Sequence, residues 1–454
     1  MEYKFLLNGE TVCVTGESQT RTLLDWLRET RGMTGTKEGC NEGDCGACTV
    51  MVTDRNGSRS MNACILLLPQ LHGKAVRTVE GISGPTGEMH PVQSAMIEHH
   101  GSQCGFCTPG FVVSMAVAHK NGRKDFDDQL AGNLCRCTGY APIIRAAEAA
   151  ADVPVPDWMT DDLSALSADR AENMPKTSDE LASWYQANPD AILIGGATDV
   201  GLWVTKRLDN LENVAFLNGI EDLKSIEVDT GTIRIGAGVT ITDLGASIRK
   251  YHPDFAEMIR RYGSTQVRNA ATIGGNIANG SPIGDGPPAL IALGATLHLR
   301  KGETRRDILL EDYFIAYGKQ DRQPGEFVEA ISIPRQKDRL KCYKISKRFD
   351  QDISAVCGCF SIRVADGTIT DAHVAFGGMA ATPKRASNLE KALIGQPWTR
   401  QIVDAALPAF ATDFTPMSDM RASAGYRLKI AENMLIRYFL EDNDIATRVL
   451  EVAP

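Results

Sequence analysis

Eight cysteines, grouped in two sets near the start of the chain, are the strongest chemical signal in the sequence. The first set runs Cys40-x4-Cys45-x2-Cys48, with Cys64 further along. A two-iron, two-sulfur (2Fe–2S) cluster needs four thiolates that converge on two irons, and three of them commonly come from one loop with this spacing of four and then two. The first set therefore predicts a 2Fe–2S site.

Three glycines, Gly39, Gly43 and Gly46, alternate with the cysteines of this loop. We expect them to provide the backbone freedom, including positive φ, that a sharply turning ligand loop needs. Zinc is an alternative, and so is a glycine-rich turn whose cysteines pack as small apolar side chains. Zinc ligands usually come as two closely spaced pairs, so the observed spacing favours the cluster.

The second set consists of two close pairs, Cys104-x2-Cys107 and Cys135-x-Cys137. Taken alone, this pattern fits a zinc site as well as it fits a cluster. His99 and His100 precede the first pair and raise the possibility of mixed ligation. Since four cysteines already complete a ligand set, we expect the two histidines to mark a helix end instead.

Both cysteine sets, in this order, resemble the molybdenum hydroxylases. In that family a plant-type ferredoxin domain precedes a helical domain whose cluster is held by Cys-x2-Cys and Cys-Arg-Cys. The resemblance implies two 2Fe–2S clusters. It implies eight cysteine ligands: Cys40, Cys45, Cys48, Cys64, Cys104, Cys107, Cys135 and Cys137.

Composition excludes several classes of protein. The chain carries 48 basic and 57 acidic side chains, a net charge of −9, without a block of Lys or Arg. This balance argues against nucleic acid or an anionic membrane as a partner. No apolar run approaches the ~18 residues of a membrane helix, and the first residues lack the features of a signal peptide. Twelve cysteines without an export signal favour metal binding in a reducing cytoplasm.

The cysteine-rich half is expected to form two domains and a linker. Residues 1–84 predict a β-grasp, plant-type ferredoxin domain, with a hairpin at Asn8-Gly9 and a helix over 22–30. We expect Cys13, in that hairpin, to be a packed thiol. Residues 85–152 change to helical periodicity and predict a four-helix 2Fe–2S domain, in which Cys107 and Cys137 precede helix starts. Residues 153–176 are rich in Pro and Asp and predict a linker.

Two glycine-rich stretches follow the linker. A short apolar strand over 191–194 runs into Gly195-Gly196-Ala197-Thr198-Asp199, and a second stretch covers 272–285. Small residues let backbone amides approach a pyrophosphate, so two such loops could clasp one dinucleotide. A Rossmann site is not expected, because the nearest match, Gly284-x-Gly286-x-x-Ala289, has prolines at its variable positions and no preceding strand.

The family resemblance implies that these stretches hold FAD. It places an α+β FAD-binding domain, similar to vanillyl-alcohol oxidase, at 177–336 and an α+β C-terminal flavoprotein domain at 337–454. Lys347 lies close enough to Lys344 to compete for the role of the cofactor lysine. The implied FAD residues are Leu193, Ile194, Gly195, Gly196, Ala197, Thr198, Asp199, Val200, Tyr262, Thr272, Ile273, Gly274, Gly275, Asn276, Asp285 and Lys344.

Another cysteine pair, Cys357-x-Cys359, has no partner pair nearby. We expect it to lie on a strand and to pack in the protein core. No residue of this chain is assigned a catalytic role. The chain ends where a fused relative continues into a molybdenum domain, so we expect molybdopterin on a separate large subunit.

The resemblance implies an electron-transfer subunit of the xanthine dehydrogenase branch. Such a subunit passes electrons from the oxidation of hypoxanthine or xanthine to urate through both clusters to FAD and then to NAD, in a cytoplasmic dimer of heterodimers. One alternative is the equivalent subunit of a hydroxylase that acts on an aldehyde or an N-heterocycle. An alternative of another class is a zinc-stabilised, non-redox assembly protein.

Overall fold

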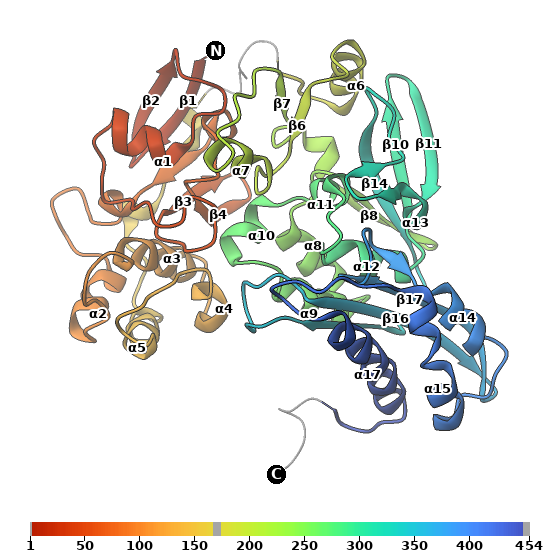
Figure 1. Cartoon of the computed structure of the whole chain (residues 1–454). Coiled ribbons are helices and arrows are strands. Elements are labelled where there is room, and N and C mark those ends of the chain that lie inside the picture. The colour runs from red at the N-terminus through yellow and green to blue at the C-terminus, as the bar shows by residue number, and fades with distance from the viewer. Residues whose placement is uncertain (1, 167–173, 448–454) are drawn as a thin grey trace. The chain divides into compact units, whose positions relative to one another are not determined.

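The structure is a computed structural model that describes residues 2–166 and 174–447, and it has an α+β, multidomain fold (Figure 1). The chain forms two compact units. Unit 1 comprises Met1–Thr177, Asp190–Glu221 and Gly263–Ala271, and unit 2 comprises Ser178–Pro189, Asp222–Tyr262 and Thr272–Pro454.

Unit 1 begins with a ferredoxin-like sheet whose strand order is β2-β1-β5-β3-β4. Its strands are β1 (Glu2–Leu7), β2 (Glu10–Thr15), β3 (Thr49–Asp54), β4 (Gly57–Asn62) and β5 (Ala75–Arg77). The β1–β2 turn has positive φ at Asn8 (52°) and Gly9 (89°), as a two-residue hairpin requires. The helix begins with α1 (Leu23–Asp25) and continues as a wide turn over Trp26–Thr30, so the expected hairpin and helix are confirmed.

The expectation that Cys13 is packed is wrong. Side chains alternate between the two faces of β2, and Val12 and Val14 take the buried face. Cys13 therefore points outward and is exposed.

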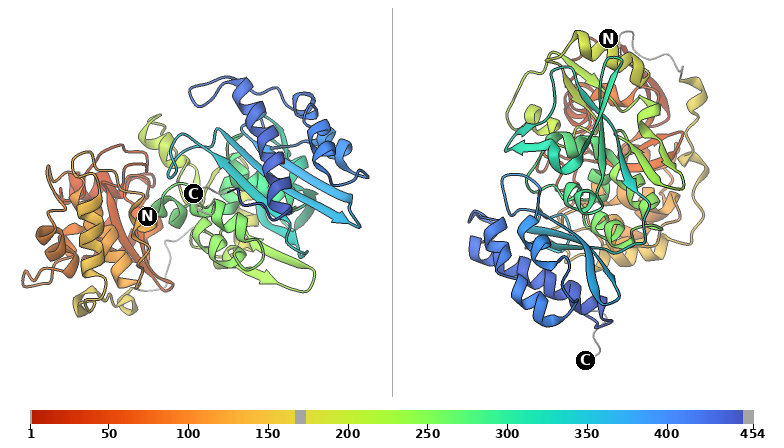
Figure 2. Two further views of the ribbon diagram at one scale, coloured as in Figure 1. Left: turned by 90° about the horizontal axis from the view of Figure 1, so that it is seen from below. Right: turned by 90° about the vertical axis from the view of Figure 1, so that its right-hand side faces the viewer.

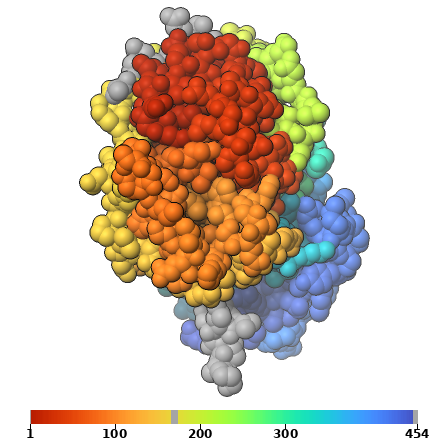
Figure 3. Space-filling view, turned by 90° about the vertical axis from the view of Figure 1, so that its left-hand side faces the viewer, coloured from red at the N-terminus to blue at the C-terminus, as the bar shows by residue number. Residues whose placement is uncertain are grey.

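Four α-helices form the next domain: α2 (Pro91–Glu98), α3 (Thr108–Lys120), α4 (Phe126–Leu130) and α5 (Ala141–Ala150). All residues of α3 from Gly110 to His119 are buried, so this helix is the core of the domain. His99 is the C-cap of α2, which confirms the expected helix end. In the space-filling view the ferredoxin-like domain (red) and the helical domain (orange) form one continuous surface (Figure 3).

The remaining described parts of unit 1 lie against these two domains. The segment after α5 is held by an ion pair between buried Arg77 and Asp161 (2.7 Å) and by a hydrogen bond from Lys120 Nζ to the Met159 carbonyl (2.6 Å). Unit 1 also contains a parallel strand pair and two short helices. These are β6 (Ile192–Ile194), β7 (Val214–Phe216), α7 (Val200–Thr205) and α10 (Thr265–Ala270).

Unit 2 contains a five-stranded sheet of order β11-β10-β14-β9-β8 and a four-stranded sheet of order β15-β16-β17-β18. The first sheet has β8 (Ile226–Val228), β9 (Thr232–Gly236), β10 (Thr296–Lys301), β11 (Thr304–Leu309) and β14 (Phe327–Pro334), and the hairpin β12 (Phe314–Ala316) and β13 (Lys319–Gln320) stands beside it. The second has β15 (Leu340–Ile345), β16 (Val356–Ala365), β17 (Thr368–Gly377) and β18 (Lys384–Arg385).

Helices cover both sheets of unit 2. They are α6 (Ser178–Ala187), α8 (Ile241–Ile248), α9 (Pro253–Arg260), α11 (Ile273–Asn279), α12 (Gly286–Ala292), α13 (Leu310–Tyr313), α14 (Ser387–Leu393), α15 (Arg400–Ala406), α16 (Ala409–Asp413) and α17 (Ala424–Asp442). Helix α17 packs on β16, as the dark blue helix in Figure 2 shows. Cys357 and Cys359 on β16 are buried, which confirms that they pack in the core. No helix of the described residues is long and apolar enough to cross a membrane.

Candidate iron–sulfur and flavin sites

The first cysteine set surrounds a loop whose amides point at sulfur. The Asp44 and Cys45 amides donate to Cys40 Sγ, and the Cys40 amide donates to Cys45 Sγ, each at 3.3 Å. Cys48 and Cys64 are 2% and 1% exposed, so half of the set is shielded from water. Amide donors stabilise thiolate, which is the form that binds iron.

The three loop glycines serve two different purposes. Gly43 and Gly46 have positive φ (80° and 68°), as expected. Gly39 does not; instead, a Cβ there would lie 2.6 Å from Cys45 Sγ, so its smallness makes room for a ligand sulfur. The expectation of positive φ at Gly39 is wrong because close approach, not backbone strain, selects glycine there.

The thiols of the first set contact one another. Hydrogen bonds with the Cys40 and Cys48 thiols, together with burial, raise the pKa of the Cys64 thiol well above its ordinary value. Hydrogen bonds with the Cys45 and Cys64 thiols lower the pKa of Cys40. The four sulfurs thus form a chain, Cys45–Cys40–Cys64–Cys48.

The second set meets as two pairs, Cys104 with Cys137 and Cys107 with Cys135. Cys107 is the N-cap of α3, as expected, whereas Cys137 stands three residues before Tyr140, the N-cap of α5. Burial raises the pKa of Cys107 to about 12. Burial also acts on Cys135, but hydrogen bonds from Thr138 and nearby amides outweigh it and lower that pKa to about 7.

The donor sets fit 2Fe–2S clusters better than a single metal ion. Among residues 2–166 and 174–447, no three His, Cys, Asp or Glu side chains converge as ligands of one ion would. A tetrahedral zinc site needs such convergence, whereas a binuclear cluster is held by four thiolates distributed over two irons. The second set meets as two pairs of thiols, and the first set brings four thiols into one chain of contacts, so each set supplies four sulfurs for two irons.

A backbone hydrogen bond joins the two sets. The Leu134 amide donates to the Cys45 carbonyl at 3.0 Å, and Leu134 directly precedes Cys135. The ligand Cys45 of one set is therefore linked to the ligand Cys135 of the other by one hydrogen bond and a short run of backbone.

A buried polar network reinforces this junction. Gln266 on α10 is 0% exposed, and its amide nitrogen donates to Asn133 Oδ1 (3.1 Å) and Thr49 Oγ1 (3.2 Å). The side-chain nitrogen Nδ2 of Asn133 in turn donates to the backbone carbonyl of Gly46 at 3.0 Å. The network connects α10, the first cysteine loop and the segment that carries Cys135.

The first proposed flavin segment, residues 193–200, belongs to unit 1. It turns at Ala197, where φ is 57°, and a Cβ on Gly196 would lie 1.9 Å from the Ala270 carbonyl oxygen. Gln70 Nε2 donates to the Gly195 carbonyl at 3.2 Å, and Lys206 Nζ donates to the Cys40 carbonyl at 2.5 Å. This segment therefore lies against the domain that carries the first cysteine set.

The other proposed flavin residues belong to unit 2. Thr272 caps α11, because its hydroxyl accepts from the Gly275 amide at 3.1 Å. Gly274 packs on Ala237, whose Cβ would be 2.5 Å from an added Cβ. The side-chain nitrogen Nδ2 of Asn276 donates to Tyr262 Oη at 3.1 Å. The other side-chain atom, Asn276 Oδ1, is buried with no partner within the described part of the chain. An unpaired buried acceptor beside an aromatic hydroxyl is suited to a polar ligand.

Asp285 and Lys344 form a buried ion pair. Lys344 Nζ lies 2.5 Å from Asp285 Oδ2, and the Ser354 hydroxyl donates to Asp285 Oδ1 at 2.5 Å. Lys347 is exposed and instead donates to the Met420 carbonyl. The structure thus brings Lys344, not Lys347, to Asp285.

Sequence reasoning missed several of these residues. Gln266, Asn133 and Leu134 come from distant parts of the chain, and no spacing rule relates them. Ser354 likewise has no local motif around it. Only tertiary structure shows that Leu134 bonds to Cys45 and Ser354 to Asp285. It also shows that Gln266 and Asn133 form a network beside the first cysteine loop.

The fold and the paired thiols define an iron–sulfur flavoprotein module, and family comparisons specify its type. Residues 5–68 match the 2Fe-2S iron-sulfur cluster binding domain, and residues 78–148 match the [2Fe-2S] binding domain. Residues 172–336 match the FAD binding domain in molybdopterin dehydrogenase, and residues 341–442 match the CO dehydrogenase flavoprotein C-terminal domain. The chain is the iron–sulfur and FAD module of the molybdenum hydroxylases.

Whole relatives are larger than this chain. Xanthine dehydrogenase 2 of Arabidopsis thaliana is 30% identical over 91% of this chain, and xanthine dehydrogenase of Dictyostelium discoideum is 29% identical over 96%. The chain spans only 38% and 40% of the length of these two relatives.

Solved structures of other enzymes share part of the fold. A carbon monoxide dehydrogenase from Hydrogenophaga pseudoflava matches with a TM-score of 0.55 and 28% identity, over 58% of this chain and 93% of the matched chain. Quinoline 2-oxidoreductase from Pseudomonas putida 86 has the same TM-score at 21% identity, over 59% of this chain and 94% of its own.

Proposed function

We propose that the chain carries electrons from a molybdenum site on a partner subunit to FAD and then to NAD. The hydrogen bond from the Leu134 amide to the Cys45 carbonyl carries the proposal, since it joins two cysteine sets of the type that holds 2Fe–2S clusters. When bound, a 2Fe–2S cluster supplies one-electron transfer, and a flavin accepts two electrons and returns them as hydride.

The residues of the chain support one direction of travel. Cys104 and Cys137 of the second set are exposed, which leaves that set open to a partner. Cys135 is connected to Cys45 by the backbone of Leu134 and its hydrogen bond to the Cys45 carbonyl. The segment after β6 contacts the first set through the hydrogen bond from Lys206 to the Cys40 carbonyl. Electrons would therefore enter at the second set and leave from the first.

FAD would be held by the residues that the family resemblance implies. In unit 1 the resemblance assigns the backbone of residues 193–200 to the pyrophosphate. In unit 2 it assigns Thr272 to Asn276 to the cofactor and Tyr262 to the flavin ring. The paired side chains of Asp285 and Lys344 would offer one acceptor and one donor to the cofactor. Asn276 Oδ1 supports this assignment because it is a buried acceptor without a hydrogen-bond donor among the described residues.

The net reaction would be hydroxylation of a substrate carbon by water: R–H + H2O + NAD+ gives R–OH + NADH + H+. The C–H bond breaks and a C–O bond forms on the partner subunit, and NAD+ takes two electrons and one proton. Xanthine or hypoxanthine is the proposed substrate, with urate as product, because several relatives are named xanthine dehydrogenases. We further propose a dimer of heterodimers with a molybdopterin-binding large subunit.

A second candidate is the same role in a hydroxylase with another substrate. It is favoured by the solved relative at 28% identity, whose name gives carbon monoxide as its substrate. A zinc-stabilised, non-redox protein is disfavoured, because residues 5–68 and 78–148 both match 2Fe–2S domains.

The test is to purify the native complex and follow NAD+ reduction at 340 nm with xanthine, hypoxanthine, an aldehyde and an N-heterocycle in turn. The proposal expects turnover with the purines, and turnover only with another substrate selects the second candidate. Reduction of the bound flavin by substrate without any NADH would contradict NAD as acceptor.

A further inference from the structure

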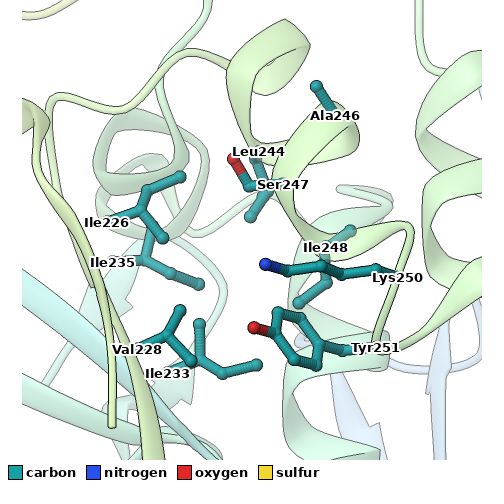
Figure 4. Close-up of a pocket in the computed structure, with 10 residues that line it drawn as sticks. All are labelled: Ile226, Val228, Ile233, Ile235, Leu244, Ala246, Ser247, Ile248, Lys250 and Tyr251. Carbon is teal, nitrogen blue, oxygen red and sulfur yellow. The ribbon is translucent and has the colours of Figure 1, made fainter.

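Unit 2 contains an apolar pocket that the electron-transfer role does not use (Figure 4). Its volume is about 270 Å³, and it lies between the β8–β9 hairpin and α8. The hairpin contributes Ile226, Val228, Ile233 and Ile235, and the helix contributes Leu244 and Ile248. Drug-sized ligands occupy pockets of roughly 300–1,000 Å³, so this volume suits a smaller molecule.

Three polar groups converge on this pocket from the helix side. They are the hydroxyls of Ser247 and Tyr251 and the amine of Lys250 (Figure 4). None of the three side chains makes a hydrogen bond or ion pair to any residue that the structure describes. An apolar cavity with a few convergent polar groups is the usual form of a small-molecule site.

The charge at this end of the pocket is positive. Lys250 Nζ lies 4.8 Å from the Tyr251 ring centroid, and the Arg335 guanidinium lies 5.6 Å from the same centroid. Arg335 donates to the Asp229 carbonyl, while the Asp229 carboxylate is occupied by the Gly231 and Thr232 amides, at 2.6 Å each. Lys250 therefore keeps a charge that a ligand anion can neutralise.

We propose that this pocket binds a small amphipathic anion, with its apolar chain against Ile226 and Val228 and its carboxylate at Lys250 and Tyr251. Hydrophobic burial against Ile226 and Val228 supplies affinity, and the amine and hydroxyls select a negatively charged head group. This site is independent of the iron and flavin assignments, so either can fail without the other.

Calorimetric titration of the full-length protein tests the proposal with three eight-carbon probes: octanoate, 1-octanol and octylammonium. Octanoate is expected to bind at least tenfold more tightly than octylammonium, and more tightly than octanol. Lengthening the acid from hexanoate to octanoate should tighten binding by about fourfold per methylene. No saturable binding of octanoate, or equal affinity for all three probes, would overturn the proposal.

Charge reversal locates the head group. Lys250→Glu is expected to weaken octanoate binding at least tenfold, and Lys250→Gln by less. Arg249→Glu is the matched control, because Arg249 is an exposed neighbouring cation that does not line the pocket. It should change the affinity by less than threefold. Equal losses in the two Glu variants would show general charge attraction and overturn the site.

Discussion

Burial shifts the pKa values of individual side chains in this protein, and His90 shows the effect most directly. Burial, with a smaller contribution from nearby His119, lowers the pKa of His90 to about 4. The ring is fully buried at the N-cap of α2, where Nδ1 accepts from the Val92 amide at 3.2 Å. The folded protein thus keeps this histidine neutral at a pH where the unfolded chain protonates it.

This difference predicts a pH dependence of stability. Unfolded histidine titrates near 6.5, so between about pH 6.5 and pH 4 the unfolded chain binds a proton that the folded protein does not. Stability should fall as pH is lowered through this window, with a loss of roughly 2 kcal/mol between pH 7 and pH 5 due to His90.

His90→Asn isolates that contribution, since asparagine retains a capping acceptor and does not titrate. Urea unfolding at pH 7 and pH 5 should show a smaller acid loss in the variant than in the native protein. An identical loss in both would mean that His90 is not neutral in the fold.

The buried pair of Asp285 and Lys344 predicts a stability loss of another kind. Asp285→Asn leaves the Lys344 charge buried without a counter-charge, and breaking such a pair costs about 3 kcal/mol or more. Asp404→Asn is the control, because Arg400 and Asp404 form an exposed helical pair that is worth about 0.5 kcal/mol or less.

Both variants can be compared by chemical denaturation followed by circular dichroism. The account expects the Asp285 variant alone to lose substantial stability, and to retain less FAD on gel filtration. Equal stability of the two variants would contradict the structural role of the buried pair.

At the level of elements, the cysteine loop depends on glycine at a point of contact. Gly46 has φ of 68°, and a Cβ there would lie 2.2 Å from the Gly132 carbonyl oxygen. Gly16 has a similar φ of 75° but nothing within 4 Å of an added Cβ. A comparison of substitutions at these two positions therefore separates the effect of backbone strain from the effect of close packing.

Gly46→Ala is therefore predicted to reduce the iron content of the first site, whereas Gly16→Ala should cost only about 1 kcal/mol of backbone strain. Iron and acid-labile sulfide assays on the two purified variants provide the measurement. Full iron occupancy in the Gly46 variant would show that the loop and the Gly132 segment can separate without harm.

Local patterns predicted most of the elements of unit 1. The Asn8-Gly9 turn and the Pro-led helices were readable because their signals lie within a few residues. Spacing indicated the two cysteine sets, but it did not indicate that Cys104 meets Cys137 and that Cys107 meets Cys135. The role of Gly39 and the outward side chain of Cys13 could not, because each depends on which neighbour the fold brings near.

At the scale of the whole molecule, tertiary contacts decide which segments belong together. Residues 190–221 and 263–271 are separated in the sequence from residues 1–177 yet form part of unit 1. Their attachment is explained by Gln266 inside the buried polar network and by Gln70 bonded to the Gly195 carbonyl. Neither contact has a sequence signature, so the proposed cysteine ligands could be named from the sequence and their surroundings could not.

Electron paramagnetic resonance with metal analysis tests the central claim, that the chain holds two separate 2Fe–2S clusters. The reduced protein should contain about four irons and show two cluster signals. Cys48→Ser should remove one signal and Cys135→Ser the other, while Cys13→Ser, at an exposed position, should leave both. Zinc in place of iron, or both signals surviving in the Cys48 and Cys135 variants, would contradict the account.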